Sequence, residues 1–211
     1  MKPTQIVASV ARDPSYLPAK TLVRLRYRNE APYTITTGTG NYHVFRMNSP
    51  FDPDFSAGGI SAKGFSEYAA LYTRYVCFGS SIKVTAYNWT SSYAAELVLV
   101  SMPRDSALAS FNAALAQPNC SRRRILGLPS GSKNQTVLKA YANVAACFGV
   151  PKSRVRDDDV FTADTAGNPG RTAYWHIWAR NLDQTNPINV QLVIEIIYYC
   201  RFFDRKEQAE L

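Results

Sequence analysis

The chain has 211 residues, of which 46% are hydrophobic and 19% are charged, so it can fold around a sizeable core and is not disordered. Its formal net charge of +8 favours an anionic partner, either nucleic acid or a membrane surface. Residues 1–20 lack the apolar run of a secretory signal, and no segment reaches the roughly 18 apolar residues of a membrane span. We therefore expect a soluble protein that stays inside the cell in which it is made.

Short apolar or alternating runs separated by turns predict eight β-strands. In chain order they are residues 20–28, 41–48, 75–88, 95–102, 121–127, 133–144, 172–181 and 189–203. Two intervening segments, residues 64–72 and 105–118, carry apolar residues at helical spacing. We expect an N-terminal arm (1–19), one domain (20–205) and a C-terminal tail (206–211). Eight strands with little helix indicate an all-β, double-sheet sandwich or barrel; a jelly roll has this number of strands, but the alternation alone does not choose it over other sandwiches.

The first predicted strand contains LVRLRYR, residues 22–28, in which apolar residues and arginines alternate. Alternate side chains of a strand point to opposite faces. Val23, Leu25 and Tyr27 should therefore share one face, and three arginines should line the other. A row of like charges repels itself, which indicates an anion or a set of acids opposite it.

The sequence carries no motif of known catalytic chemistry. It contains no G-x-S-x-G elbow, no H-E-x-x-H helix and no phosphate-binding P-loop. Its two histidines, His43 and His176, fall on different predicted strands, where a single histidine is usually structural. We expect a protein that is not an enzyme and needs no cofactor.

Metal binding is only weakly indicated. Asp52 and Asp54 stand two apart in FDPDFSAGG, but Pro53 and the Gly58-Gly59 pair favour a turn in which aspartates bind their own backbone. The four cysteines, Cys77, Cys120, Cys147 and Cys200, lack any C-x-x-C spacing, so we expect buried free thiols rather than a zinc site.

The segment Tyr42–Val84 carries a specific combination of motifs: FRMNSPFDPD, a glycine-bearing loop, GFSEYAALYTRY and GSSIKV. This combination closely resembles the capsid proteins of small circular single-stranded DNA viruses that encode a replication-initiator protein, the circovirus-like group. The likeness extends more loosely from about Lys20 to RFFDRK near the C-terminus.

The resemblance implies a single eight-stranded jelly roll with strands named B to I in sheets B-I-D-G and C-H-E-F. It also implies self-assembly into the smallest icosahedral shell, of T=1 geometry, around a circular single-stranded DNA genome. We also expect a host-cell receptor of unknown identity, and localisation in the virion and, during assembly, in the host nucleus or cytoplasm. Membrane insertion is not expected, because no apolar span is present. The family's N-terminal arm is typically arginine-rich, whereas residues 1–19 contain only Lys2 and Arg12 as basic residues. This departure shifts the expected DNA contacts to the folded domain.

In the implied fold, the first strand lies beside the last, followed by residues 75–88 and 133–144. The alternation turns basic residues of all four strands to the outer face of this sheet, and Glu195 is the one acid that the predicted strands place there. Tyr87 and Tyr141 share that face and could stack on unpaired bases. Alternatively, the arginines pair with Glu195 or with acids of a neighbouring subunit. The candidate nucleic-acid contacts are Lys20, Arg24, Arg26, Arg28, Lys83, Lys139 and Arg201.

The second sheet is predicted to be covered on both faces, by loops or by neighbouring subunits, because residues 172–181 and 95–102 are apolar on both faces. The candidate subunit contacts are Tyr174, Trp178, Arg122, Arg123 and Arg124. A second functional class remains open at this point, a cellular jelly-roll binding module of lectin-like or cytokine-like type.

Overall fold

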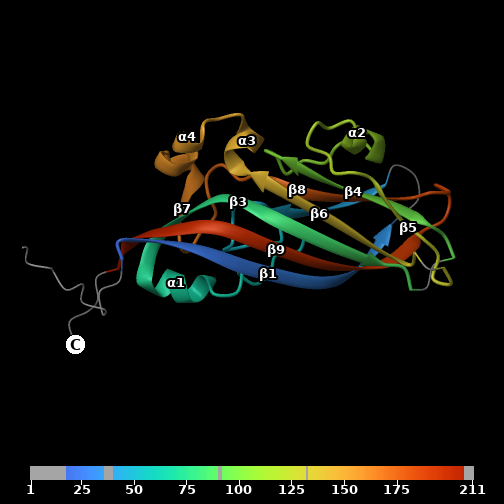
Figure 1. Ribbon diagram of the computed structural model, residues 1–211, viewed down its shortest axis with the longest axis horizontal. Helices are drawn as coiled ribbons and strands as arrows, with labels where there is room; N and C mark the ends of the chain where they lie inside the picture. Colours follow the sequence, from blue (N-terminus) through green and yellow to red (C-terminus); the bar gives the residue numbers. More distant parts are fainter. Residues whose placement is uncertain (1–17, 36–39, 90–91, 132, 207–211) are drawn as a thin grey trace, which may run out of the picture.

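The computed structural model describes residues 18–35, 40–89, 92–131 and 133–206, which form two facing antiparallel sheets (Figure 1). The first sheet has the order β1 (Lys20–Ile35), β9 (Ile188–Arg205), β3 (Tyr72–Tyr87) and β6 (Gln135–Asn143), and a short β7 (Thr162–Asp164) pairs with β3. The second has the order β2 (Asn41–Arg46), β8 (Tyr174–Asn181), β4 (Ala95–Met102) and β5 (Arg124–Leu126). These orders are B-I-D-G and C-H-E-F, so the predicted jelly roll is confirmed. Most of the predicted arm and tail, residues 1–17 and 207–211, lies outside the described residues.

The main core fills the space between the two sheets with aliphatic and aromatic side chains. Two of its polar side chains have partners across the core. The indole of Trp175 on β8 donates to the Ser80 hydroxyl on β3 at 2.9 Å, and the Tyr198 hydroxyl donates to the Arg46 carbonyl at 2.8 Å. Both hydrogen bonds join one sheet to the other, so they fix how the sheets face each other.

Strand β1 continues to Ile35, well beyond the predicted end at Arg28. Pro32 lies within it, and a proline is tolerated there because β1 is the edge of its sheet and needs no ladder bond on its outer side. Elsewhere along the same edge, the Lys63 amide donates to the Arg26 carbonyl at 2.8 Å. The edge strand is therefore partly capped by the chain itself.

Both predicted helical segments contain a helix, α1 (Phe65–Leu71) and α2 (Phe111–Leu115), but α2 is shorter than predicted because it begins only after its N-cap, Ser110. Four further short elements were not predicted: α3 (Val144–Phe148), α4 (Lys152–Asp157), the 3₁₀ turn η1 (Asp159–Phe161) and the strand β7. Helices α3 and α4 lie over one end of β3, as Figure 1 shows. No helix of the described ranges is long and apolar enough to cross a membrane.

The outer face of the second sheet is covered by the chain's own α2 segment. Phe111 and Ala114 of α2 pack with Leu108 against Val98 on β4 and Trp178 on β8, in a second, smaller core. The sequence left open whether loops or neighbouring subunits cover the second sheet. On its outer face, the loop that contains α2 does so.

Candidate nucleic-acid interface

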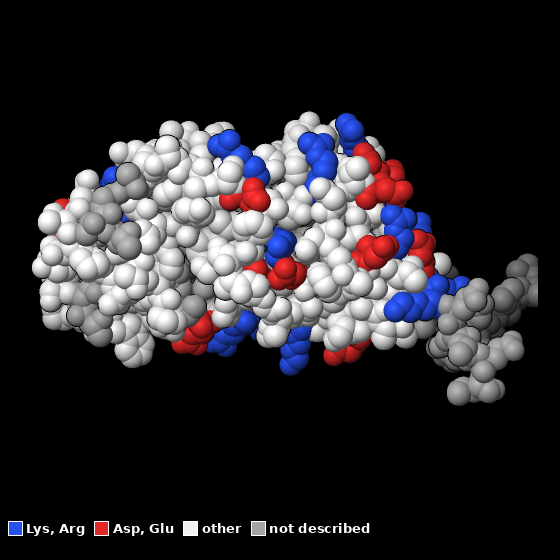
Figure 2. All heavy atoms as spheres, turned by 180° about the vertical axis from the view of Figure 1, so that it is seen from behind, with Lys and Arg blue, Asp and Glu red and all other residues white. Residues whose placement is uncertain are grey.

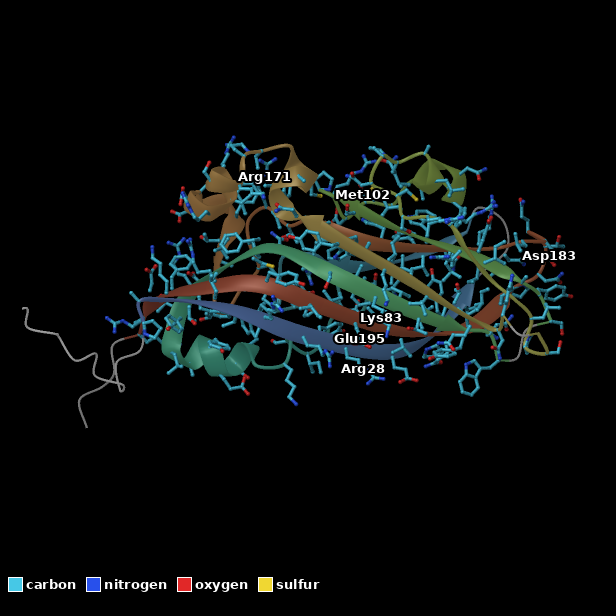
Figure 3. The ribbon with its side chains drawn as sticks, viewed as in Figure 1. Arg28, Lys83, Met102, Arg171, Asp183 and Glu195 are labelled. Atoms are coloured by element: carbon cyan, nitrogen blue, oxygen red, sulfur yellow. The ribbon has the colours of Figure 1, made fainter. Side chains whose placement is uncertain are left out.

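Four side chains form a line across the outer face of the first sheet, which we call the charge row: Lys139, Lys83, Glu195 and Arg28. The strand register places Lys139 opposite Lys83, Lys83 opposite Glu195, and Glu195 opposite Arg28. Figure 3 shows the last three following one another across β3, β9 and β1. Because neighbouring strands are about 4.8 Å apart, the row presents closely spaced charges along a line perpendicular to the strands.

Glu195 is shared between two cations of this face. Its carboxylate oxygens lie 3.7 Å from the Arg26 guanidinium and 3.6 Å from the Lys83 ammonium. The Arg26 side chain is nevertheless 67% exposed, whereas that of Glu195 is 24% exposed. The attraction within such long and exposed ion pairs is weak, so both cations remain able to contact a phosphate.

Strand β1 has the alternation that the sequence predicts. Leu25 and Tyr27 are buried, and Arg24, Arg26 and Arg28 are exposed on the outer face. The prediction that Glu195 is the one acid on this face is wrong, because β1 is longer than predicted and adds Glu30. The Glu30 carboxylate accepts a hydrogen bond from the Gln191 side chain at 3.4 Å. The described outer face of the four long strands, away from α4, thus holds five cations and two acids: Arg24, Arg26, Arg28, Lys83, Lys139, Glu30 and Glu195.

Arg201 and Lys20 lie apart from the charge row, near α4. The Arg201 guanidinium donates to the Arg156 carbonyl at 3.0 Å and stands 5.6 Å from the Phe78 ring centre. Arg156, followed by Arg201 and Lys20, lowers the pKa of Asp157. Arg201 therefore links α4 to the sheet. Arg201 and Lys20, both predicted to contact nucleic acid, lie near the acid Asp157 at this end of the sheet.

The residues predicted to contact other subunits differ in their exposure and in their contacts within the chain. Trp178 is 2% exposed beneath α2, and Tyr174 is half-buried with its ring edge-to-face on Phe55. Arg123 donates to the buried carboxylate of Glu96 at 3.0 Å, whereas Arg122 and Arg124 are exposed. Trp178 and Arg123 thus have partners within the chain.

Glu96 is a buried acid that sequence reasoning missed. Arg180 donates from Nε to its Oε1 atom at 2.8 Å, and Arg123 binds its Oε2 atom. The Arg180 guanidinium also lies 4.8 Å from the ring centre of Phe111 on α2. This cluster links β4, β8, α2 and the residues just before β5. Its only signal in the sequence was a single Glu in the apolar run AELVLVSM.

Both weak metal candidates are occupied by protein partners. Asp54 accepts hydrogen bonds from the amides of Ser56 and Ala57 at 3.0 and 3.1 Å, which confirms the predicted turn, and its carboxylate lies 3.1 Å from His43 Nε2. Asp52 pairs with Arg46 at 2.6 Å. Within the described ranges, no group of three or more His, Cys, Asp or Glu residues could hold a metal ion.

His176 and the cysteines have structural surroundings. His176 is fully buried, its Nε2 atom lies 3.0 Å from the Arg104 carbonyl, and its ring stacks with Tyr42. Burial lowers the pKa of His176. All four cysteines are free thiols, but only Cys77 and Cys200 are buried as predicted, whereas Cys120 and Cys147 are partly exposed.

A further surface lies at one end of the sandwich, where three loops meet. The Asn88 side chain donates to the carbonyls of Tyr93 and Gly127, and the Leu182 amide donates to the Ala94 carbonyl. Large apolar side chains are exposed here, including Trp89 (70%), Tyr93, Leu128 and Leu182. This end, on the left in Figure 2, shows few charged side chains, whereas acids and bases are interspersed over the rest of that view.

No family model and no curated protein matches the chain. Among solved structures, it is similar to a chain of Desmodium yellow mottle tymovirus, with 13% identity, a TM-score of 0.45, and coverage of 95% of this chain and 99% of that one. It is similar to a chain of mud crab tombus-like virus, with 11% identity, a TM-score of 0.49, and coverage of 94% and 96%. A chain of the Macrobrachium rosenbergii nodavirus particle shows 9% identity, a TM-score of 0.48, and coverage of 90% and 97%.

Proposed function

We propose that this chain is a viral capsid protein that assembles into a small icosahedral shell of T=1 geometry and packages circular single-stranded DNA. The genome would lie against the outer face of the β1-β9-β3-β6 sheet. The motif combination in Tyr42–Val84 and the B-I-D-G and C-H-E-F sheet orders support the capsid assignment. Neither a catalytic constellation nor a cofactor enters this function.

The observation that carries the packaging role is the charge balance of that sheet face. The part of that face away from α4 carries five cations and two acids, so its net charge is +3 and can attract an external anion. Phosphates bound by such cations release counterions, which gives binding that is independent of base sequence and sensitive to salt. A protein that packages its own genome without reading each base needs this kind of contact.

The loop end that contains Trp89 is the surface we favour for contacts between copies. Exposed aromatic and aliphatic side chains are typical of the centre of a protein interface, and the view in Figure 2 shows few charged side chains at this end. Tyr174, Arg122 and Arg124 remain candidate rim contacts, since each keeps some exposed surface.

The decisive experiment images the purified full-length chain by negative stain and measures the 260/280 nm absorbance ratio of the particles. The variant Arg24→Ser/Arg26→Ser/Arg28→Ser should still form shells but should contain less nucleic acid. The charge-matched control is Lys152→Ser/Arg154→Ser/Arg156→Ser on α4, which removes three cations that are not among the five counted on the sheet face. Chains that stay monomeric at every salt concentration and pH would contradict the capsid proposal, and unchanged nucleic-acid content in the first variant would contradict the packaging role.

A further inference from the structure

An aromatic ring stands beside the charge row on the same sheet face. Tyr141 on β6 is 61% exposed and lines a shallow groove together with Ile197, Lys83, Lys139 and Arg26. The register explains this grouping, because Tyr141 lies opposite Ser81, Ser81 opposite Ile197, and Ile197 opposite Arg26. The groove therefore has an aromatic wall on one side, an apolar residue within it, and cations at its borders.

The Tyr141 ring is held in position from below and from the side. Its ring centre lies 5.9 Å from that of Tyr199, with an interplanar angle of 72°, and the Arg24 guanidinium lies 5.5 Å from the Tyr199 ring centre. Gly79 lies beneath it on β3, where an added Cβ would stand 3.2 Å from the Tyr141 hydroxyl oxygen and 2.5 Å from the Ala142 carbonyl oxygen. Glycine at this position lets β6 and the tyrosine approach β3 closely. The ring is thus supported without being covered.

We propose that Tyr141 is a stacking platform for one unpaired nucleobase, while Lys139, Lys83 and Arg26 bind the phosphates on either side of it. This inference rests on the proposed packaging function and names what the packaged strand must offer: bases that are free to leave a stack. Aromatic side chains next to cations bind single strands in this way, whatever the base, because every base has a flat π-face. In a duplex the base faces are already stacked, so the groove selects single-stranded over double-stranded nucleic acid.

The acid in the groove is compatible with this ligand. Glu195 lies between Arg26 and Lys83 and is less exposed than either of them. Both ion pairs are long and partly exposed, so Arg26 and Lys83 can each still contact a phosphate. A protein segment from a second copy is the competing occupant, and the experiment below includes an outcome that identifies it.

The test measures binding of the full-length chain to a labelled oligodeoxythymidine of about 16 nucleotides, by fluorescence anisotropy. An abasic strand of the same length has the same phosphates but no bases, and a duplex of the same length has no free bases. The unaltered protein should bind oligodeoxythymidine about tenfold more tightly than the abasic strand, which is the size expected of one stacked base. Equal affinity for these two probes would overturn the inference without the need for any variant.

Variants then locate the effect. Tyr141→Leu should lose about tenfold in affinity for oligodeoxythymidine, keep its affinity for the abasic strand, and keep the salt dependence of binding, whereas Tyr141→Phe should bind like the unaltered protein. The matched control is Tyr42→Leu, which removes a partly exposed tyrosine from the other sheet. Thermal unfolding of each variant shows that it folds.

The outcomes separate this inference from the proposed function. If Tyr141→Leu binds normally while the triple arginine variant binds weakly, the stacking site is wrong and electrostatic packaging stands. If both variants bind normally, the packaging role fails as well. If Tyr141→Leu abolishes particles but leaves binding of dissociated subunits unchanged, this groove receives another copy of the chain and the inference is overturned.

Discussion

Glu195→Gln is the sharpest test of how the charge row works, because it removes one negative charge and changes the side-chain shape very little. The net charge of the described face rises from +3 to +4, and Arg26 and Lys83 lose their shared partner. If a phosphate sits about 7 Å from this carboxylate, the repulsion that disappears is about 0.6 kcal/mol in water, a factor of about three in affinity.

Counterion release gives a similar magnitude by a separate route. One further neutralised phosphate on a single strand steepens the dependence of log K on log salt by about 0.7, which corresponds to about fourfold in affinity between about 1 M and 0.15 M salt. We therefore expect Glu195→Gln to bind oligodeoxythymidine three- to fourfold more tightly at about 0.15 M salt and to converge with the unaltered protein at about 1 M.

The assay is anisotropy titration across that salt range, combined with urea unfolding. Because both ion pairs are long and partly exposed, stability should change by less than about 1 kcal/mol. Weaker binding by Glu195→Gln, together with a large loss of stability, would refute this reasoning. The arginine stripe would then be a structural network built around Glu195.

Three other predictions concern stability and assembly. Glu96→Gln should lower the free energy of unfolding by about 3 kcal/mol, because it removes the buried carboxylate that pairs with the largely buried Arg180. Glu67→Gln at an exposed position of α1 should change it little, and equal effects in urea titrations would contradict the pairing of Glu96. Trp89→Ser should fold normally but shift the chain from particles to small species in size-exclusion chromatography, and an unchanged particle yield would remove the loop end as a contact surface. Burial lowers the pKa of His176, so the unfolded chain binds this proton more readily and stability should fall as the pH drops through 6.5; His176→Gln should flatten that part of the urea-stability profile, and a profile identical to that of the unaltered protein would exclude His176 as the cause.

The sequence was informative wherever a strand keeps a strict alternation. The faces of β1 and of the central part of β9 follow from period two alone, and so does the outward position of Lys83 and Lys139. The sheet order, by contrast, came from the motif resemblance, because alternation says which face a residue occupies and not which strand lies next to it.

The errors have local physical causes. The first strand was predicted to end at Arg28, but it continues through Pro32, which an edge strand tolerates, and the extension carries Glu30. Phe78 shares its parity with the buried Ile82, yet a register shift between Cys77 and Gly79 turns its ring toward Arg201 on the outer face.

Helix α3 left a weak signal that could have been found. Asn143 accepts a hydrogen bond from the Ala145 amide at 2.8 Å as an N-cap, and Gly149 closes the helix with a φ of 64°. An Asn and a Gly around five apolar residues are consistent with a short helix, but the β-like run before them concealed it. Without α3 and α4, the sequence could not show that Arg201 has a partner.

The alternation in β1 has a consequence for folding that does not depend on any ligand. If β1 slipped by one residue against β9, Leu25 and Tyr27 would turn to water, and Arg24, Arg26 and Arg28 would turn into the core. Each guanidinium buried without a partner costs several kcal/mol, so a slipped sheet is far less stable than the native pairing. The side chains that we propose hold a genome therefore also act as gatekeepers, which reject misaligned strands before the shell or its cargo exists.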